Sequence, residues 1–342
     1  MNDRFLRACH RQSVDATPVW FMRQAGRYMP EYRALRQRYS LLELCRAPEL
    51  AVEVTLQPVR TLGVDAAILF SDLLLPLAPM GLTFEFLKGE GPSFHEPVRS
   101  AADVDRVRPI DPAHELAYVL DTIRMLKAQL DVPLIGFVGA PFTLASYAIE
   151  GGPSKDFART KAMMYTEPQA WHALCGRLAD MAGAYLRAQI AAGVDAVQIF
   201  DSWVGHLSAT DYREFALPHS RRVFDAIADL GTPSIHFGVG TGMLLEDMAT
   251  AGSSVVGADW RVPLDHAWQL IGDHGIQGNL DPTLLLGPWP RVRAAVEDIV
   301  QRVGGRPGHI FNLGHGVLPM TSPDVVQRVT RLVHSLTATR NT

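Results

Sequence analysis

The sequence predicts an α/β fold, a single (β/α)₈ barrel of the TIM type, on three observations. Eight short apolar runs alternate with eight segments of helical spacing. Glycines follow the helical segments, prolines stand near their starts, and polar residues gather after the apolar runs. Strand, helix and strand in repetition produce a parallel sheet, and eight such units close most simply into a barrel. A doubly wound open sheet is the main structural alternative.

The expected strands are short runs of apolar residues with β-branched or aromatic character. Such runs are typical of strands that are buried on both faces, as in a barrel. In chain order they lie at Val19–Met22, Ala66–Phe70, Leu134–Val138, Ala196–Phe200, Ser234–Phe237, Ser254–Ala258, Gly275–Gly278 and His309–Leu313.

The expected helices lie between these runs and after the last of them. Glycine takes a left-handed conformation just past a helix at low cost, and it holds this place at Gly63, Gly193, Gly231, Gly252 and Gly304. Proline near a helix start gives up no needed N–H group. The helical segments are Pro48–Thr61, Pro112–Leu130, Pro168–Ala192, Asp211–Leu230, Met243–Ala251, Pro263–Asp273, Pro290–Val303 and Pro323–Leu336.

Two insertions account for length beyond a minimal barrel, and we expect one domain over residues 1–342. Gly81–Ser100 has alternating apolar residues around a Gly-Glu-Gly turn, which predicts a β-hairpin after the second strand. Ala148–Thr166 is interrupted by Gly and Pro after the third strand. Both insertions fall at the carboxyl ends of the strands, where barrel enzymes build their active sites. We call this end the mouth.

Composition limits the classes of partner. The 342 residues hold 32 Lys and Arg against 36 Asp and Glu, a net charge of −4, so a global basic surface for nucleic acid is not indicated. The most apolar stretch, Ala66–Leu82, contains Asp72 and two prolines and does not predict a membrane span. Three distant cysteines and an amino terminus without a signal peptide indicate a reducing, cytoplasmic setting.

Several cofactor chemistries are disfavoured. The four lysines, Lys88, Lys127, Lys155 and Lys161, all lie away from the strand ends, which argues against Schiff-base chemistry and pyridoxal phosphate. A catalytic metal needs about three converging ligands. The strand ends offer only scattered histidines such as His236 and His315, so a metal site is not favoured.

Arg23, Arg27 and Asp72 are the leading candidates for chemistry. Two arginines four residues apart at the mouth would repel each other unless an anion lay between them, so they are typical of a carboxylate or phosphate clamp. The alternative is that each is paired with a carboxylate on a neighbouring loop. Asp72 follows an apolar strand and is either an active-site anion or a cap for a backbone N–H group.

Two long motifs resemble the signatures of the uroporphyrinogen decarboxylase family. The first is PVWFMRQAGR, which ends at Arg27, and the second is GFVGAPFTLASYAIEG, which contains Tyr147. The resemblance continues through FSDLLLP, IFDSW and FNLGHGVLP and covers essentially the whole chain. It implies a single (β/α)₈ barrel, in agreement with the pattern of strands and helices.

The resemblance also implies an activity and a site. The activity is decarboxylation of the four acetate side chains of uroporphyrinogen III to methyl groups, giving coproporphyrinogen III, with no metal or organic cofactor. The substrate is a small-molecule tetrapyrrole, and the family is typically a homodimer. Carried over by position, the catalytic residues are Asp72, Arg23, Arg27 and Tyr147, and the substrate contacts are Arg23, Gln24, Ala25, Gly26, Arg27, Asp72, Tyr147, Ser202 and His315.

The reaction can run without a cofactor because a protonated pyrrole is itself an electron sink. Asp72 would stabilise that positive charge. A tight arginine pair on the departing carboxylate would stabilise the ground state instead. We therefore expect that one of Arg23 and Arg27 holds non-reacting side chains and the other faces the reacting acetate. Two rivals remain open: a zinc-dependent corrinoid or thiol methyltransferase of the same superfamily, and a tetrapyrrole carrier without activity.

Overall fold

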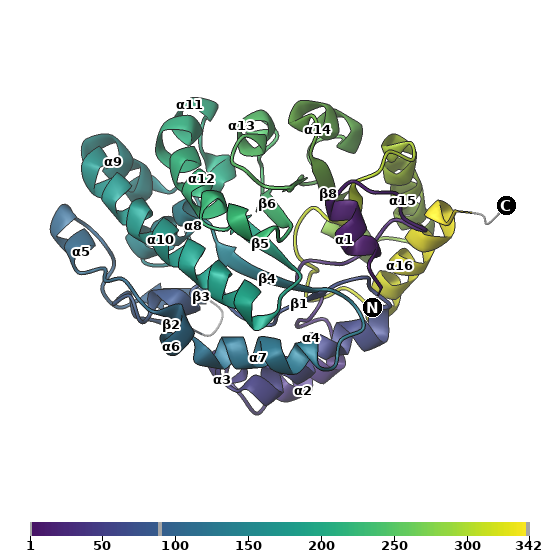
Figure 1. The fold of residues 1–342 in the computed structure, drawn as a ribbon, viewed down its shortest axis with the longest axis horizontal. Helices are drawn as coiled ribbons and strands as arrows, with labels where there is room; N and C mark the ends of the chain where they lie inside the picture. The colour runs from purple at the N-terminus through teal and green to yellow at the C-terminus, as the bar shows by residue number, and fades with distance from the viewer. Residues whose placement is uncertain (1, 88–90, 340–342) are drawn as a thin grey trace.

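Seven parallel strands form the centre of the molecule, surrounded by helices (Figure 1). The computed structural model describes residues 2–87 and 91–339. The strand order is β1-β4-β5-β6-β7-β8-β9, and the fold class predicted from the sequence is confirmed. The strands are β1 (Ala67–Ile68), β4 (Leu134–Gly139), β5 (Ala196–Asp201), β6 (Ser234–Gly238), β7 (Val255–Gly257), β8 (Gly275–Leu280) and β9 (His309–Leu313).

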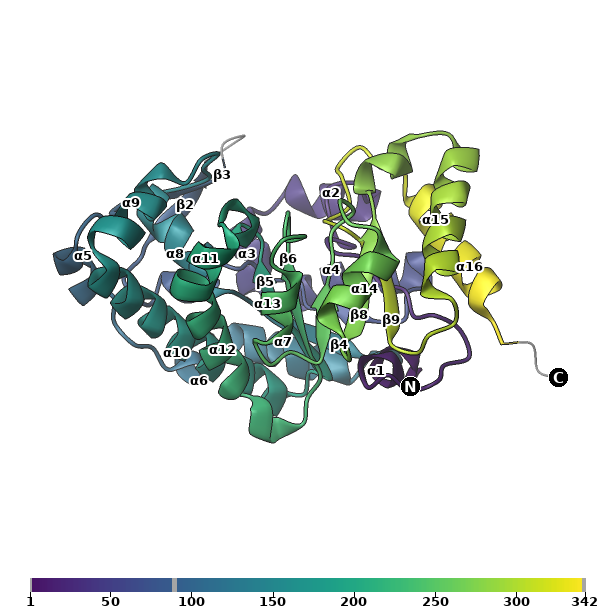
Figure 2. The same ribbon diagram turned by 90° about the horizontal axis from the view of Figure 1, so that it is seen from above.

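Each of the eight expected helical segments contains a helix that packs around the sheet (Figure 2). The contacting faces form one buried apolar cluster. These are α4 (Pro48–Leu62), α7 (Ala117–Lys127), α10 (Pro168–Ala192), α12 (Leu217–Asp225), α13 (Leu245–Ala249), α14 (Leu264–Ile271), α15 (Trp289–Val303) and α16 (Pro323–Thr337). Further α-helices, which the sequence pattern did not separate, are α1 (Arg4–Cys9), α2 (Pro30–Arg36), α3 (Leu41–Arg46), α5 (Ala101–Asp105), α6 (Pro112–Glu115), α8 (Pro141–Glu150), α9 (Ala158–Thr166) and α11 (Ala209–Asp211). Short 3₁₀ turns occupy η1 (Leu75–Leu77), η2 (Val204–His206), η4 (Ala228–Leu230) and η5 (Pro282–Leu286). No helix of the described residues is both long and apolar enough to cross a bilayer.

Two expected helices are interrupted. Pro112–Leu130 breaks at Leu116, which leaves helical geometry at φ −118° and ψ 25° between α6 and α7. Asp211–Leu230 contains a π-helical turn, η3 (Tyr212–Ala216), directly before α12. Pro218 explains this wider turn, because proline lacks an N–H group and its ring crowds the carbonyl one turn earlier.

The first expected strand, Val19–Met22, is wrong as a strand, although the segment closes the ring. Val19 makes a single isolated parallel bridge with Phe311 of β9. Beyond it a side chain replaces the ladder, since the Met22 N–H group donates to Asn312 Oδ1 at 3.0 Å. The segment therefore occupies the eighth position of the barrel without regular strand pairing.

The predicted hairpin is confirmed and packs against the second insertion. β2 (Phe84–Leu87) pairs antiparallel with β3 (Gly91–Phe94), while the tip of the expected hairpin, residues 88–90, lies outside the described residues. The second insertion leaves α8 at Gly151, which has φ +84°, and continues into α9. The Phe94 N–H group donates to the Gly151 carbonyl at 2.9 Å, and both insertions lie at one end of the molecule (Figure 2).

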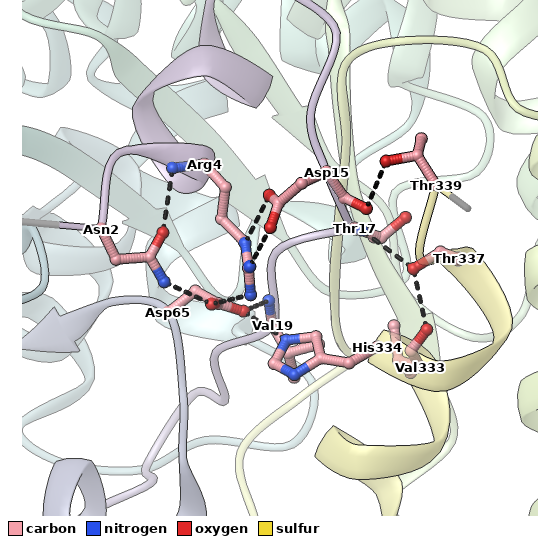
Figure 3. Close-up of polar contacts among 10 residues, drawn as sticks. All are labelled: Asn2, Arg4, Asp15, Thr17, Val19, Asp65, Val333, His334, Thr337 and Thr339. Carbon is pink, nitrogen blue, oxygen red and sulfur yellow. Dashed lines mark hydrogen bonds and ion pairs between the residues drawn. The ribbon is translucent and has the colours of Figure 1, made fainter. Parts of the chain in front are cut away.

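A single buried carboxylate joins the two ends of the chain where the ring closes (Figure 3). Asp65, 2% exposed, accepts from Asn2 Nδ2, Arg4 Nη1 and the Val19 N–H group, each at 2.8 Å, and lies 2.7 Å from His334 Nε2. Its own N–H group donates to the Val19 carbonyl at 2.8 Å. Asp65 thus ties α1, the ring-closing segment, the approach to β1 and α16 together.

An Asp65→Asn variant should lose stability. The amide removes the negative charge opposite Arg4 and places an N–H donor against other donors. Removing one partner of a buried ion pair lowers the free energy of unfolding by about 3 kcal/mol or more. Urea unfolding followed by circular dichroism measures this loss. Asp273→Asn is the matched control, because Asp273 is 99% exposed at 3.9 Å from Arg11 and should change stability by less than about 0.5 kcal/mol. Equal unfolding midpoints for the two variants would refute the role given to Asp65.

Candidate active site

The structure brings the expected site residues to the mouth of the barrel. Parallel strands end at the same side of the ring, so residues that follow different strands become neighbours there. The contributing positions are Arg23 and Arg27 after the ring-closing segment, Asp72 after β1, Tyr147 on α8 after β4, Ser202 after β5 and His315 after β9.

The turn from Arg23 to Arg27 is held from below by Gln24. This side chain is fully buried; its Nε2 donates to the Ala66 carbonyl at 3.1 Å, and its Oε1 accepts from the Phe21 N–H group at 3.1 Å. The Gln24 carbonyl in turn accepts from the Tyr28 hydroxyl at 2.6 Å. Gln24 therefore anchors the turn with its side chain and does not present that side chain at the mouth.

The two arginines are exposed and lack carboxylate partners within residues 2–87 and 91–339. The alternative that Arg23 and Arg27 pair with neighbouring loops is therefore wrong. The Arg23 side chain lies across Gly316, where an added Cβ would stand 2.4 Å from Arg23 Cδ. Ala25 and Gly26, between the arginines, are half-buried.

Asp72 lies half-buried beside Arg23 and does two things at once. Its Oδ1 accepts from the Leu74 N–H group at 2.9 Å, so the capping interpretation holds. Its Oδ2 has no hydrogen-bond partner among the described residues. Burial raises the pKa of this carboxyl, while the Leu74 N–H group and the Arg23 charge act in the opposite direction.

Tyr147 lies on α8 and faces both charges. Burial and the nearby Asp72 carboxylate raise the pKa of its hydroxyl to about 12, with Arg23 opposing them, so the hydroxyl remains a proton donor in neutral solution. Its ring packs on Trp203 with centroids 3.8 Å apart and planes tilted by 36°. Trp203 also contacts Phe157, at a centroid distance of 4.9 Å. This aromatic stack holds the tyrosine ring in place.

Ser202 sits next to an anchored turn at the end of β5. The neighbouring Asp201 is fully buried, and its Oδ1 accepts from Thr143 Oγ1 at 3.0 Å. The same Thr143 oxygen accepts from the Trp203 N–H group at 3.3 Å. Ser202 is half-buried between these fixed neighbours, so the turn presents its hydroxyl from a rigid base.

His315 is held neutral among positive charges. Burial lowers its pKa to about 4, Arg23 and Arg261 act in the same direction, and Asp259 acts against them. At neutral pH the imidazole is uncharged, with one nitrogen able to donate and one able to accept.

Two further arginines near the site were not singled out from the sequence. Arg261 follows β7 by four residues, among the polar residues at the strand ends, but no sequence motif indicated a binding or catalytic role for it. Burial and the Asp72 carboxylate raise the pKa of the Cys45 thiol, and Arg36 opposes them, so Arg36 and Asp72 both lie near that thiol. An isolated arginine on a helix such as α2 carries no signal before the fold is known.

The described residues do not assemble a cluster typical of a metal site. No three His, Cys, Asp or Glu side chains gather there in a way that could hold an ion. His236, one of the scattered histidines, is fully buried inside the barrel, with Nε2 3.7 Å from Asp201 Oδ2. The mouth instead offers guanidinium groups, one free carboxylate oxygen, hydroxyls and a neutral imidazole, which suits a substrate that carries carboxylates and N–H groups.

Comparison with known proteins shows the family of this chain. Residues 1–336 match the family model described as uroporphyrinogen decarboxylase (URO-D). The chain is 57% identical to the uroporphyrinogen decarboxylase of Sorangium cellulosum, covering 98% of this chain and 97% of that protein. It is 55% identical to the one from Carboxydothermus hydrogenoformans, covering 99% and 97%. A methyltransferase from Methanosarcina mazei shares the fold, with a TM-score of 0.81 at 20% identity over 98% of each chain.

Removing the Arg23 charge should raise the pKa of His315. In an Arg23→Gln variant we expect the value to move upward from about 4 but to stay below that of a free histidine, because burial is the larger cause of the shift. An NMR titration of the His315 ring measures it. Arg293→Gln is the control, since Arg293 pairs with Glu297 on the surface of α15 and should leave His315 unchanged. An unaltered value in Arg23→Gln would contradict the proximity of the two groups.

Proposed function

Because this chain belongs to the uroporphyrinogen decarboxylase family, we propose that it converts uroporphyrinogen III to coproporphyrinogen III by removing four acetate carboxylates as CO₂. The observation that carries the proposal is that Arg23 and Arg27 have no carboxylate partner among the described residues, while Arg23 lies near Asp72, whose Oδ2 is free. A polycarboxylate with inward pyrrole N–H groups is complementary to free cations and a free carboxylate oxygen at one mouth.

Each decarboxylation can be balanced without a cofactor. A proton adds to the ring α-carbon next to the carbon that bears the acetate and makes the ring cationic. The bond between the methylene and the carboxylate then breaks, and CO₂ leaves. The electron pair of the broken bond stays with the methylene carbon, forms a double bond to the ring and neutralises its charge. A proton adds to the methylene carbon to form the methyl group, and the ring returns its first proton. One acetate and one proton thus give one methyl group and one CO₂.

Asp72 is proposed to stabilise the cationic ring. Its Oδ1 is held by the Leu74 N–H group, so Oδ2 can accept from pyrrole N–H groups while the carboxylate stays in one orientation. A pyrrole cation above Asp72 also favours the ionised form of a carboxyl whose pKa burial raises. The attraction strengthens as positive charge develops, which is the condition for accelerating the chemical step.

The other side chains divide between the centre and the rim of the mouth. The Arg23 charge lowers the pKa of each of three groups at the centre, those of Asp72, Tyr147 and His315. We therefore assign Arg23 to the reacting acetate. The Arg27 charge lowers the pKa of Tyr32, which is not one of the groups at the centre. We therefore assign Arg27 to carboxylates that do not react. Tyr147 donates a hydrogen bond near Asp72. Ser202 and His315 are proposed to orient propionates.

Two measurements distinguish the decarboxylase from the carrier and the methyltransferase. Anaerobic incubation with uroporphyrinogen, followed by oxidation and chromatography, should reveal porphyrins with seven, six, five and four carboxylates. Binding without loss of mass would support the carrier, and stoichiometric zinc in purified protein would support the methyltransferase. Either of those results would overturn the proposed decarboxylase.

Asp72→Asn should slow the reaction by about a hundredfold or more. The amide keeps the shape but loses the charge opposite the cationic ring, and the loss of one electrostatic partner of a transition state typically costs a factor of 10² to 10³. Steady-state assays should show this loss in kcat with substrate affinity changed far less. Asp273→Asn, a surface carboxylate, should retain wild-type activity. Wild-type kcat in a folded Asp72→Asn protein would rule out the proposed role.

We also propose that the chain works as a cytoplasmic homodimer of one barrel domain spanning residues 1–342. Met243, after β6, is 86% exposed and Met320, after β9, is 76% exposed. Both lie on loops that follow strands, at the mouth end of the barrel. Because the family is typically a homodimer, we assign a second copy of this chain as the partner that covers them. Its three cysteines are free, as is usual for proteins in a reducing compartment.

Replacing both methionines by aspartate should therefore weaken the dimer. Sedimentation velocity at micromolar concentration should detect a dimer for the wild type and monomers for Met243→Asp with Met320→Asp. Leu336→Asp, at an exposed position on α16, is the control and should remain dimeric. A wild-type protein that sediments only as a monomer would refute the assembly, and a dimeric double variant would refute the assigned surface.

A further inference from the structure

Arg261 is fixed at the mouth by three separate contacts. The buried Asp259 carboxylate pairs with its Nη1 through Oδ2 and accepts from its backbone N–H group through Oδ1 at 3.0 Å. The same carboxylate accepts from the Gly240 N–H group at 2.5 Å, which ties the ends of β6 and β7. The guanidinium carbon lies 4.0 Å from the centre of the Trp260 ring. Arg261 is therefore held as a rigid, oriented cation.

Part of this guanidinium is left open. Its Nε and Nη2 groups have no hydrogen-bond partner within the described chain, and the side chain is 52% exposed. A hollow of about 290 Å³ also touches Arg261, but it extends toward α15, is lined by Asp281 and Asp298, and does not reach His315. A planar edge with two N–H donors matches the two oxygens of a carboxylate.

Close packing at the end of β9 brings His315 near both Arg23 and Arg261. An added Cβ at Gly314 would lie 2.5 Å from the Trp260 N atom, and one at Gly316 would lie 2.4 Å from Arg23 Cδ. Trp260, next to Arg261 in the chain, thus packs against the residue before His315, and the Arg23 side chain packs against the residue after it. Both guanidinium groups lower the pKa of the imidazole, as expected for this arrangement.

We infer that Arg261 selects the substrate by binding a propionate carboxylate, one that the reaction leaves in place, beside His315. This inference rests on the proposed function. Arg23, and not Arg261, is among the charges that act on Asp72, so the reacting acetate above Asp72 lies nearer to Arg23. A carboxylate at Arg261 keeps its partner while CO₂ leaves elsewhere. Such a contact contributes equally to the binding of substrate and product.

The test compares substrate and product in matched variants. Arg261→Gln should raise both the KM for uroporphyrinogen and the inhibition constant for coproporphyrinogen by about tenfold, because a lost charged hydrogen bond weakens affinity by about that factor. Since the contact is the same in the ground and transition states, kcat should stay within about twofold of the wild type. Arg293→Gln should leave all three values unchanged.

Several outcomes would overturn the inference. A folded Arg261→Gln protein with wild-type KM and product inhibition would do so, as would a fall in kcat alone, which would place Arg261 at the reacting centre. Should the glutamine variant fail to fold without its pair to Asp259, Arg261→Lys keeps the charge but not the planar edge. Its KM and inhibition constant should both rise, and wild-type values in Arg261→Lys would overturn the inference. Direct binding of coproporphyrinogen tests the role of Arg261 without requiring turnover. Absence of turnover in the wild type would refute the proposed function instead.

Discussion

The carboxylate of Asp65 is the constraint on which the closure of this barrel depends. A barrel must join its last strand to its first, and here the joining segment has only one bridging residue, Val19. Asp65 compensates by accepting from the Val19 N–H group and by pairing with Arg4 and His334 from the two ends of the chain. A single charged acceptor with several donors in a buried place replaces the ladder that a regular eighth strand would supply.

This closure also determines the geometry of the mouth. Asp65 pins Val19 four residues before Arg23, and the same carboxylate stands directly before β1, which leads to Asp72. The other side of the segment is held by Asn312 of β9, three residues before His315. The cation, the anion and the imidazole of the site are thus positioned from one closed seam. The distances that matter for chemistry at the mouth follow from contacts made deeper in the barrel.

Local patterns in the sequence located most of the sheet because buried parallel strands are short apolar runs with clear ends. They misplaced Val19–Met22, whose backbone groups are satisfied by the side chains of distant residues such as Asn312. They also missed α8, which carries Tyr147, because its residues are apolar on nearly all faces and have no helical period to detect. Periodicity reports which faces are buried, and it fails where side chains substitute for backbone partners or where every face is buried.

The site was predictable to the extent that its residues follow strands directly. Arg23, Asp72 and Ser202 each come within a few residues of a strand or of the closing segment, so the barrel rule places them at the mouth. Arg261 also follows a strand, yet its relation to His315 depends on Trp260 packing against Gly314, more than fifty residues away. Contacts of this kind exist only once the ring has closed.

Backbone strain adds an independent argument for where function lies. Among the described residues, three that are not glycine have positive φ, and two of them, Arg23 and Phe157, border the mouth. Each such residue costs roughly 1 to 3 kcal/mol, which persists only where the surroundings impose it. For Arg23 the buried amide of Gln24 and the bare backbone of Gly316 impose it. The strained backbone at Arg23 lowers stability and directs its guanidinium toward Asp72 and His315. Arg23 has no carboxylate partner among the described residues, so an anionic ligand best explains why this strain is kept.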